Sequence, residues 1–387
     1  MLSVESSVLM QFNLKPTARM VRGRGSYLWD EHGRRYLDFV QGWAVNALGH
    51  SPALVRDAVL AQLDAVLNPG PAYHNQPSHA LAERLATLSG FDRVFLGGSG
   101  ADANEAAVKL ARKWGQRHKQ GAFEVITTLD GFHGRTLAMS NATGKPGFAD
   151  ACAPLIAGFP KVPFGDLEAV ARAIGERTVA VMVEPIQGEA GAVTPPAGYL
   201  RGLRALCDRA GILLIVDEVQ TGMARTGPLF AHQHEDVRPD LMTLGKSLGA
   251  GLPISALLAR EEVACFELGD HGGTFCAHAV LSAAALAVVE HISSRAHSAL
   301  RKTSAQALES ALRGLAERHG GKLRGAGHLW GVVLPSPRSE QVRDHCFAAG
   351  LLINAPRPDV LRLMPALDVG GDEIAAMREL LDAALRS

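Results

Sequence analysis

Residues Ile212-Leu213-Leu214-Ile215-Val216-Asp217 decide the fold class of this 387-residue chain. The five apolar residues are too few for a helix and do not alternate with polar ones, so they predict a strand that is buried on both faces. The segment Thr178–Val183 has the same character, and Tyr199–Ala210 between the two has the periodicity of a helix. A strand, a helix and a strand in this order predict a mostly parallel sheet sandwiched by helices, the α/β class.

The alternation of strands and helices continues from about residue 90 to residue 275. It adds a helix at 99–116 and strands at 93–96, 124–129 and 254–259. Helices then dominate at 277–292, 299–318 and 372–385, with short strands at 329–333 and 360–363. The first 50 residues predict hairpins, followed by a helix from Ser51 with Pro52 at its first position. We therefore expect a large domain over residues 51–275 and a smaller α+β domain built from both termini, residues 1–50 and 276–387.

Composition excludes several classes of protein. Lys and Arg total 39, as do Asp and Glu, which removes the electrostatic case for binding nucleic acid or an anionic membrane. The longest strongly apolar run, near 279–289, is well short of the about 20 residues that span a membrane, and residues 1–5 do not begin a secretory signal. We expect a soluble cytoplasmic protein with no metal site and five reduced thiols: Cys152, Cys207, Cys265, Cys276 and Cys346.

A Gly/Ser turn joins the strand at 93–96 to the helix that follows. Ser99, Gly100 and Ala101 stand where the helix begins, so backbone N–H groups and the positive end of the helix dipole would face a bound phosphate. Residues 98–103 also fit the loose dinucleotide pattern G-x-G-x-x-A, and Ser99 fits an ordinary helix cap. The turn alone leaves a phosphate site, a nicotinamide site and a plain helix cap open.

An acid and a lysine complete a chemical pattern with this turn. Asp217 ends a buried strand, at the edge of the sheet where α/β proteins bind ligands. Lys246 follows in the Gly/Ser-rich turn 245–251. Alone, the acid could equally be a metal ligand or a cap, and the lysine a surface charge. Asp217, Lys246 and the possible phosphate site at Ser99, Gly100 and Ala101 together match what pyridoxal phosphate requires. The lysine binds the aldehyde carbon of the cofactor, and the acid keeps the pyridine nitrogen of the cofactor protonated.

The chain resembles the class III aminotransferases of fold type I, most closely the acetylornithine and ornithine aminotransferase group. The matching segments lie in family order between about residues 20 and 365, at 42–50, 99–112, 131–136, 184–189, 217–227, 246–251 and 271–275. The resemblance implies a fold type I transferase with pyridoxal 5'-phosphate and a homodimer with shared active sites. It also implies transfer of the terminal amino group of an acetylornithine-like ω-amino donor to 2-oxoglutarate, giving a semialdehyde and glutamate, in arginine biosynthesis.

The resemblance assigns the cofactor residues position by position. Lys246 matches the catalytic lysine that carries the cofactor and moves the proton, and Asp217 matches the partner of the pyridine nitrogen. Other cofactor contacts are implied for Ser99, Gly100 and Ala101 at the phosphate, Phe132 and His133 at the ring, Val219 behind it and Gln220 at its phenolic oxygen. Thr274 matches a threonine that reaches the phosphate from the partner subunit.

Two arginines and one acid match substrate-binding positions. On spacing alone each arginine is an ordinary surface charge, but guanidinium groups suit carboxylates because the pairing is bidentate. Arg135 matches the residue that binds the carboxylate farthest from the reacting amine, and Arg362 matches the residue that binds the α-carboxylate of glutamate. Glu189 matches the acid that pairs with Arg362 when the bound substrate has no carboxylate there.

Departures from the family pattern concern the amino donor. Gly42 stands where ornithine aminotransferases carry an aromatic hydroxyl for the free α-amino group, which favours an N-acylated substrate, and Trp43 would narrow the mouth of the site. Residues 276–279, Cys-Ala-His-Ala, replace the usual Gly-Gly-Asn-Pro. They motivate an alternative donor, another ω-amino acid or a diamine in secondary metabolism. A nicotinamide-dependent dehydrogenase is a more distant alternative, because it leaves Lys246 and Asp217 without a role.

Overall fold

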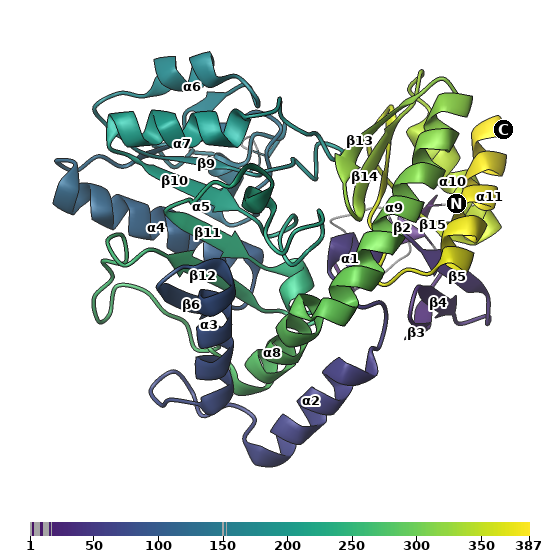
Figure 1. Ribbon diagram of the computed structural model, residues 1–387, viewed down its shortest axis with the longest axis horizontal. Helices are drawn as coiled ribbons and strands as arrows, with labels where there is room; N and C mark the ends of the chain where they lie inside the picture. The colour runs from purple at the N-terminus through teal and green to yellow at the C-terminus, as the bar shows by residue number, and fades with distance from the viewer. Residues whose placement is uncertain (1, 4–7, 11–14, 17, 149–150, 152) are drawn as a thin grey trace.

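Figure 1 shows a larger body around a central sheet and a smaller body that contains both ends of the chain. The computed structural model describes residues 2–3, 8–10, 15–16, 18–148, 151 and 153–387. Helices α8 (Ala279–Ser293) and α9 (Arg295–Arg318) lead from the larger body to the smaller one.

The central sheet has seven strands in the part of the chain that the structure describes, in the order β6-β12-β11-β10-β9-β7-β8. Neighbouring strands are parallel except at β12, which runs antiparallel to both β11 and β6. The α/β class with a mostly parallel sheet is therefore confirmed. The strands are β6 (Arg93–Gly97), β7 (Glu124–Thr128), β8 (Lys161–Val162), β9 (Thr178–Val183), β10 (Leu213–Asp217), β11 (Leu241–Leu244) and β12 (Ser255–Ala259).

Both faces of this sheet are buried, as the continuous apolar strands predict. Leu213 and Ile215 of β10 pack in a cluster with residues of α4 (Gly100–His118). The alternate residues Leu214 and Val216 pack with residues of α7 (Tyr199–Ala210) on the other face. Burial on both sides fixes the position of β10, so the acid at its end, Asp217, is held on a rigid element.

The remaining helices of the larger body lie around the sheet and at its lower edge in Figure 1. They are α2 (Ala53–Ala65), α3 (Gln76–Ser89), α5 (Leu137–Ala142) and α6 (Leu167–Ala173). Helix α8 packs in one apolar cluster with residues of α2 and α3, although it follows residue 276. Pro52 is the N-cap of α2 rather than its first residue, because its ψ of 133° is extended and the helix begins one residue later than expected.

Residues from both ends of the chain build the core of the smaller body. Leu37 and Phe39 pack with Leu312, Leu361 and Met377 in a single apolar cluster. Two four-stranded sheets flank this core, in the orders β13-β14-β17-β16 and β15-β5-β4-β3, besides a β1-β2 pair. The elements are β1 (Leu2–Ser3), β2 (Lys15–Pro16), β3 (Met20–Arg24), β4 (Tyr27–Asp30), β5 (Arg35–Asp38), β13 (Lys322–Ala326), β14 (Leu329–Val333), α10 (Ser339–Ala349), β15 (Leu351–Leu352), β16 (Asn354–Arg357), β17 (Val360–Leu363) and α11 (Gly371–Arg386).

Within the described residues no single helix has the length and apolar character needed to cross a membrane. Helices α8 and α9 meet that test only as a pair, and the chain bends by 69° between them. Four of the five cysteines are free thiols, namely Cys207, Cys265, Cys276 and Cys346. Cys152 lies outside the described residues.

Candidate active site

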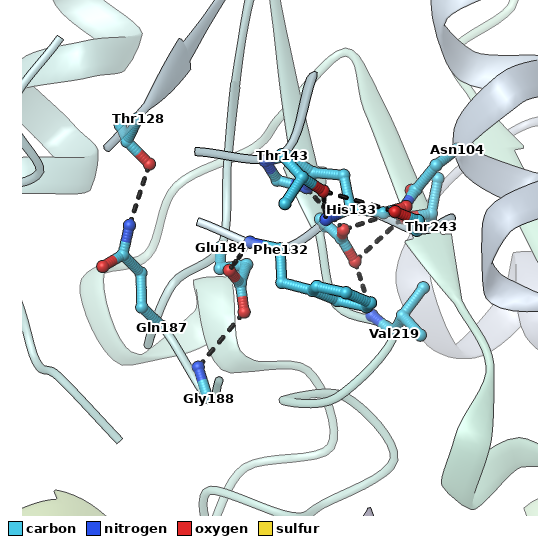
Figure 2. Close-up of polar contacts among 12 residues, drawn as sticks. Asn104, Thr128, Phe132, His133, Thr143, Glu184, Gln187, Gly188, Val219 and Thr243 are labelled. Atoms are coloured by element: carbon cyan, nitrogen blue, oxygen red, sulfur yellow. Dashed lines mark hydrogen bonds and ion pairs between the residues drawn. The ribbon is translucent and has the colours of Figure 1, made fainter. Parts of the chain in front are cut away.

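Asp217 lies at the carboxyl end of β10 and is almost completely buried. Its Oδ2 atom accepts a 2.8 Å hydrogen bond from the side-chain amide of Asn104 and lies 2.8 Å from Nδ1 of His133. Its Oδ1 atom accepts a hydrogen bond of 3.0 Å from the backbone N–H of Val219. In Figure 2 Asn104 and His133 come together from different parts of the chain with Thr243, whose hydroxyl also donates to Asp217 at 3.4 Å. The carboxylate is therefore fixed by partners on four segments.

Backbone hydrogen bonds of His133 also hold this residue next to the Asp217 carboxylate. Its N–H donates to the Thr143 hydroxyl at 3.0 Å, and its carbonyl accepts from Asn104 at 2.8 Å. Burial alone would lower the pKa of His133, but the hydrogen bond and charge of Asp217 raise it above its ordinary value. The Nε2 atom is buried and has no partner among the described residues. The hydrogen bonds from His133 and Asn104 therefore fix the orientation of the Asp217 carboxylate.

Lys246 begins the short 3₁₀ helix η3 (Lys246–Leu248), which follows β11 directly after Gly245. Its φ of +41° is unfavourable for a residue with a side chain, and such strain is typical of functional sites. Burial lowers the pKa of Lys246, and the charge of Arg362 adds to this, while Glu189 opposes it. A lowered pKa favours the neutral amine, which is the nucleophilic form.

The start of α4 forms a close cradle against the Val219 side chain. Ser99 is the N-cap of the helix, and its hydroxyl accepts the Asp102 N–H at 3.2 Å, so the expected cap is present. A Cβ atom on Gly100 would lie 2.5 Å from Cγ1 of Val219, so only glycine fits there. The predicted phosphate cradle and Val219 therefore belong to one compact unit with Asp217, to which Val219 donates.

Gln220 and Phe132 lie beside the unit formed by the start of α4, Val219 and Asp217. A Cβ atom on Gly188 would lie 1.4 Å from Oε1 of Gln220, so the chain approaches this amide as closely as glycine allows. Among the described residues neither amide atom of buried Gln220 has a hydrogen-bond partner. An unsatisfied buried amide is costly, which indicates a polar ligand atom at this position. Half-buried Phe132 packs edge-on against Phe148, with ring centroids 5.8 Å apart.

Glu184 links two backbone segments of the site, because its carboxylate accepts hydrogen bonds from both Phe132 and Gly188. Figure 2 shows its carboxylate between two backbone donors, Phe132 N–H at 2.8 Å and Gly188 N–H at 3.1 Å. Burial raises the pKa of Glu184 to about 7, although these donors and the charge of His133 favour the ionised form. Glu184 follows β9 and is a site residue that the sequence reasoning did not single out.

Arg362 and Glu189 form the ion pair that the family resemblance implies. Arg362 of β17 is fully buried, and its Nη1 donates to Oε1 of Glu189 and to the Gly188 carbonyl, both at 2.7 Å. On its other side, Nη2 and Nε donate to Oδ1 of Asn354 at 2.9 and 3.2 Å. Burial alone would raise the pKa of Glu189, but the positive charges of Arg362, Lys246 and Lys145 lower it to about 2. The acid is therefore ionised at neutral pH.

Arg135 and Thr274 are the other two residues predicted for the site. Arg135 is exposed, and its guanidinium lies 4.7 Å from the centre of the Phe148 ring. Thr274 is also exposed, and no hydrogen bond among the described residues joins it to Lys246 or Ser99. The single chain thus brings together all the predicted residues except Thr274.

A buried arginine that sequence reasoning missed ties Lys246 to the smaller body. Fully buried Arg225 donates to the carbonyls of Pro365 and His328, and lies 3.5 Å from the Ser247 hydroxyl beside Lys246. Burial lowers its pKa to about 9. Ser247 in turn donates to the Ala44 carbonyl at 3.0 Å, in the turn that contains Gly42 and Trp43. The departures at Gly42 and Trp43 are therefore next to the lysine turn.

The features of this group fit a phosphorylated pyridine. A fixed buried carboxylate, an unsatisfied Gln220 amide, a glycine cradle and a lysine with lowered pKa each match one part of pyridoxal phosphate. No group of three or more His, Cys, Asp or Glu side chains in the described residues is arranged to hold a metal ion.

Comparison with known proteins assigns the family. The family model described as aminotransferase class III matches residues 11–385. The chain belongs to the class III aminotransferases. Acetylornithine aminotransferase 2 of Bordetella bronchiseptica is 48% identical over 383 residues, which cover 98% of this chain and 97% of that protein. The acetylornithine aminotransferase of Ralstonia nicotianae is 45% identical over 98% of this chain and 97% of that protein. This class III aminotransferase is therefore an enzyme that transfers amino groups.

Solved structures of class III aminotransferases confirm the type I fold. N-acetylornithine aminotransferase of Stenotrophomonas maltophilia is 34% identical with a TM-score of 0.84, and covers 96% of each chain. Ornithine aminotransferase of Toxoplasma gondii is 30% identical with a TM-score of 0.92, over 97% of this chain and 92% of that one. The family implies pyridoxal phosphate as cofactor. The nicotinamide-dependent dehydrogenase that residues 98–103 suggested as an alternative is therefore wrong.

Proposed function

We propose that this aminotransferase moves the terminal amino group of an N-acylated ω-amino donor, acetylornithine or a close analogue, to 2-oxoglutarate. The donor's terminal CH₂–NH₂ carbon becomes an aldehyde, and the keto carbon of 2-oxoglutarate becomes the α-carbon of glutamate. The single observation that carries this proposal is the Arg362–Glu189 pair, in which a buried guanidinium already has an anion on it. Such a pair suits an enzyme that must bind a carboxylate in one half-reaction and none at that position in the other.

The cofactor contributes an aldehyde that takes up the amino group and a ring that accepts electrons. Lys246 would hold it covalently and move the proton, and Asp217, supported by His133, would keep its ring nitrogen protonated. Ser99, Gly100 and Ala101 would hold its phosphate. These roles rest on the geometry around Asp217 and on the family resemblance.

Two arginines supply the carboxylate sites that the two substrates need. Arg362 would bind the α-carboxylate of glutamate, which is adjacent to the reacting amine. Arg135, at the edge of the group, would bind the carboxylate at the far end of either substrate. Gly42 offers no side chain to grip a free α-amino group, which favours a donor whose α-amine is acylated.

A screen of single-turnover half-reactions tests the donor. Purified enzyme loaded with cofactor is mixed with acetylornithine, succinylornithine, ornithine, 4-aminobutyrate, putrescine or lysine, and the loss of the cofactor's absorption band is timed. We expect the N-acylated ornithines to react fastest, since Gly42 provides no contact for a free α-amine. A faster reaction with putrescine or 4-aminobutyrate would instead support the alternative donors that residues 276–279 motivate.

We further propose a homodimer in which Thr274 completes the phosphate site of the second subunit, because Thr274 is exposed in the single chain. Inactive Lys246→Ala protomers are mixed with inactive Thr274→Asp protomers under conditions that exchange subunits. One site of each hybrid dimer then has both an intact lysine and an intact threonine, so part of the activity should return. Demonstrated exchange without any recovery would contradict the assignment of Thr274 to the neighbouring site.

A further inference from the structure

Besides Arg362 and Lys246, Glu189 faces a third cation, Lys145, to which no role has yet been assigned. The Oε1 atom of Glu189 accepts from Arg362 at 2.7 Å, while its Oε2 atom lies 3.8 Å from Nζ of Lys145. The side chains of Glu189 and Lys145 are 19% and 28% exposed, so solvent screens this contact only in part. The carboxylate therefore lies between a buried cation and a partly exposed one.

The loop that carries Lys145 is fixed in place. Gly144, directly before it, donates its N–H to the Gly131 carbonyl at 2.9 Å and accepts from the Asp130 N–H at 3.1 Å. The Lys145 ammonium also lies 5.5 Å from the centre of the Phe148 ring. That ring carries the Arg135 guanidinium at 4.7 Å. Lys145 and Arg135, the arginine proposed to bind the far carboxylate, therefore contact the same aromatic ring.

The Glu189 charge needs a partner whenever it leaves Arg362. When an α-carboxylate occupies Arg362, the guanidinium keeps Asn354 and the Gly188 carbonyl as partners. Glu189, however, loses its hydrogen bond at a position where its side chain is only 19% exposed. Leaving an ionised carboxylate without a partner there is costly. Lys145 is already next to the second oxygen of this carboxylate, so a rotation of the Glu189 side chain can bring the two together.

We propose that Lys145 is a specificity-determining residue that receives the Glu189 carboxylate when glutamate or 2-oxoglutarate occupies Arg362. This inference rests on the proposed function, because it assumes that Glu189 leaves Arg362 for one of the two substrates. Lys145 is a positioning residue here, since it acts on the substrate through Glu189. Lys145 stabilises the arrangement in which Glu189 has left Arg362, and it thereby favours binding of the dicarboxylate substrate.

The test uses glutarate, a five-carbon dicarboxylate that has neither an amino group nor a keto group and so binds without reacting. Its dissociation constant is measured by calorimetry on the cofactor-loaded enzyme. Lys145→Met keeps the length of the side chain and removes its charge, and should weaken glutarate binding roughly 5-fold, as expected for a partly exposed ion pair. Lys145→Arg should stay within about 2-fold of the wild type, as should Lys302→Met, an exposed control on α9.

A double-mutant cycle separates this role from simple attraction between Lys145 and an anion. In the Glu189→Gln background, Lys145→Met should change glutarate binding by about 2-fold or less, because no carboxylate remains for Lys145 to receive. Equal weakening in both backgrounds, or no weakening in the single variant, would overturn the proposal. Failure of the proposed donor is a separate result: the wild type would not react with acetylornithine, while the glutarate cycle would still report on Lys145.

Discussion

Lys246→Ala is expected to lower the rate of both half-reactions by roughly 10⁴-fold, because in the proposed function this one amine supplies both covalent attachment of the cofactor and general acid–base catalysis. Lys246 has a positive φ, and burial lowers its pKa, as the proposed role of a nucleophilic amine requires. The variant should still bind pyridoxal phosphate without a covalent link, since the Ser99 cradle and Asp217 do not depend on the lysine.

Borohydride treatment followed by peptide mass spectrometry checks this assignment directly. In the wild type it should fix the cofactor irreversibly to the peptide that contains Lys246. Lys161→Ala is the matched control, because burial lowers the pKa of Lys161 too, while this lysine lies on β8 and donates to the Asn141 carbonyl. Cofactor on the Lys109, Lys145 or Lys161 peptide would contradict the role of Lys246.

The position of Asp217 could be predicted because local sequence determines it, whereas the strand before Lys246, β11, was not predicted. A continuous apolar run predicts a buried strand, and the acid that ends such a strand must lie at the ligand-binding edge of a parallel sheet. The structure places Asp217 at the end of β10 and Lys246 directly after β11, its parallel neighbour. Pairing of adjacent strands is enough to bring these two residues to one edge.

The supporting residues depend on long-range contacts, and for most of them the sequence carries no local signal. Asn104 was detectable in principle, since it is a polar residue among the buried alanines of α4. Glu184, Asn354 and Arg225 are single polar residues in loops and at strand ends, where most such residues are solvated. Their roles arise from partners far along the chain, such as Pro365 for Arg225.

Strand direction shows the same limit. Residues 254–259 have the apolar character of the parallel strands, yet β12 runs antiparallel to both its neighbours. Apolar character reports burial on both faces, which a central strand has in either direction. The chain connects β11 to β12 without a helix of the length that separates β9 from β10, so connection length was the better signal.

Glu189→Ala is expected to change the preference between the two half-reactions by roughly 10- to 100-fold, since a charge-assisted pair is worth about 1.5–3 kcal/mol. Without the acid, buried Arg362 is always available to a carboxylate. The half-reaction of glutamate should then hold or improve, and that of the ω-amino donor should fall. Donors with a free α-amine should increasingly react there, because their α-carboxylate can now occupy Arg362.

The single-turnover rates of both half-reactions, in wild type and variant, measure this change. Glu168→Ala removes an exposed acid of α6 and serves as the control for a general loss of charge. The charges of Arg362, Lys246 and Lys145 lower the pKa of Glu189 to about 2, so its charge persists across the pH range of such assays and protonation does not release Arg362. If both half-reactions fall by the same factor, Glu189 holds Arg362 in place together with the Gly188 carbonyl, and the two substrates must be distinguished elsewhere.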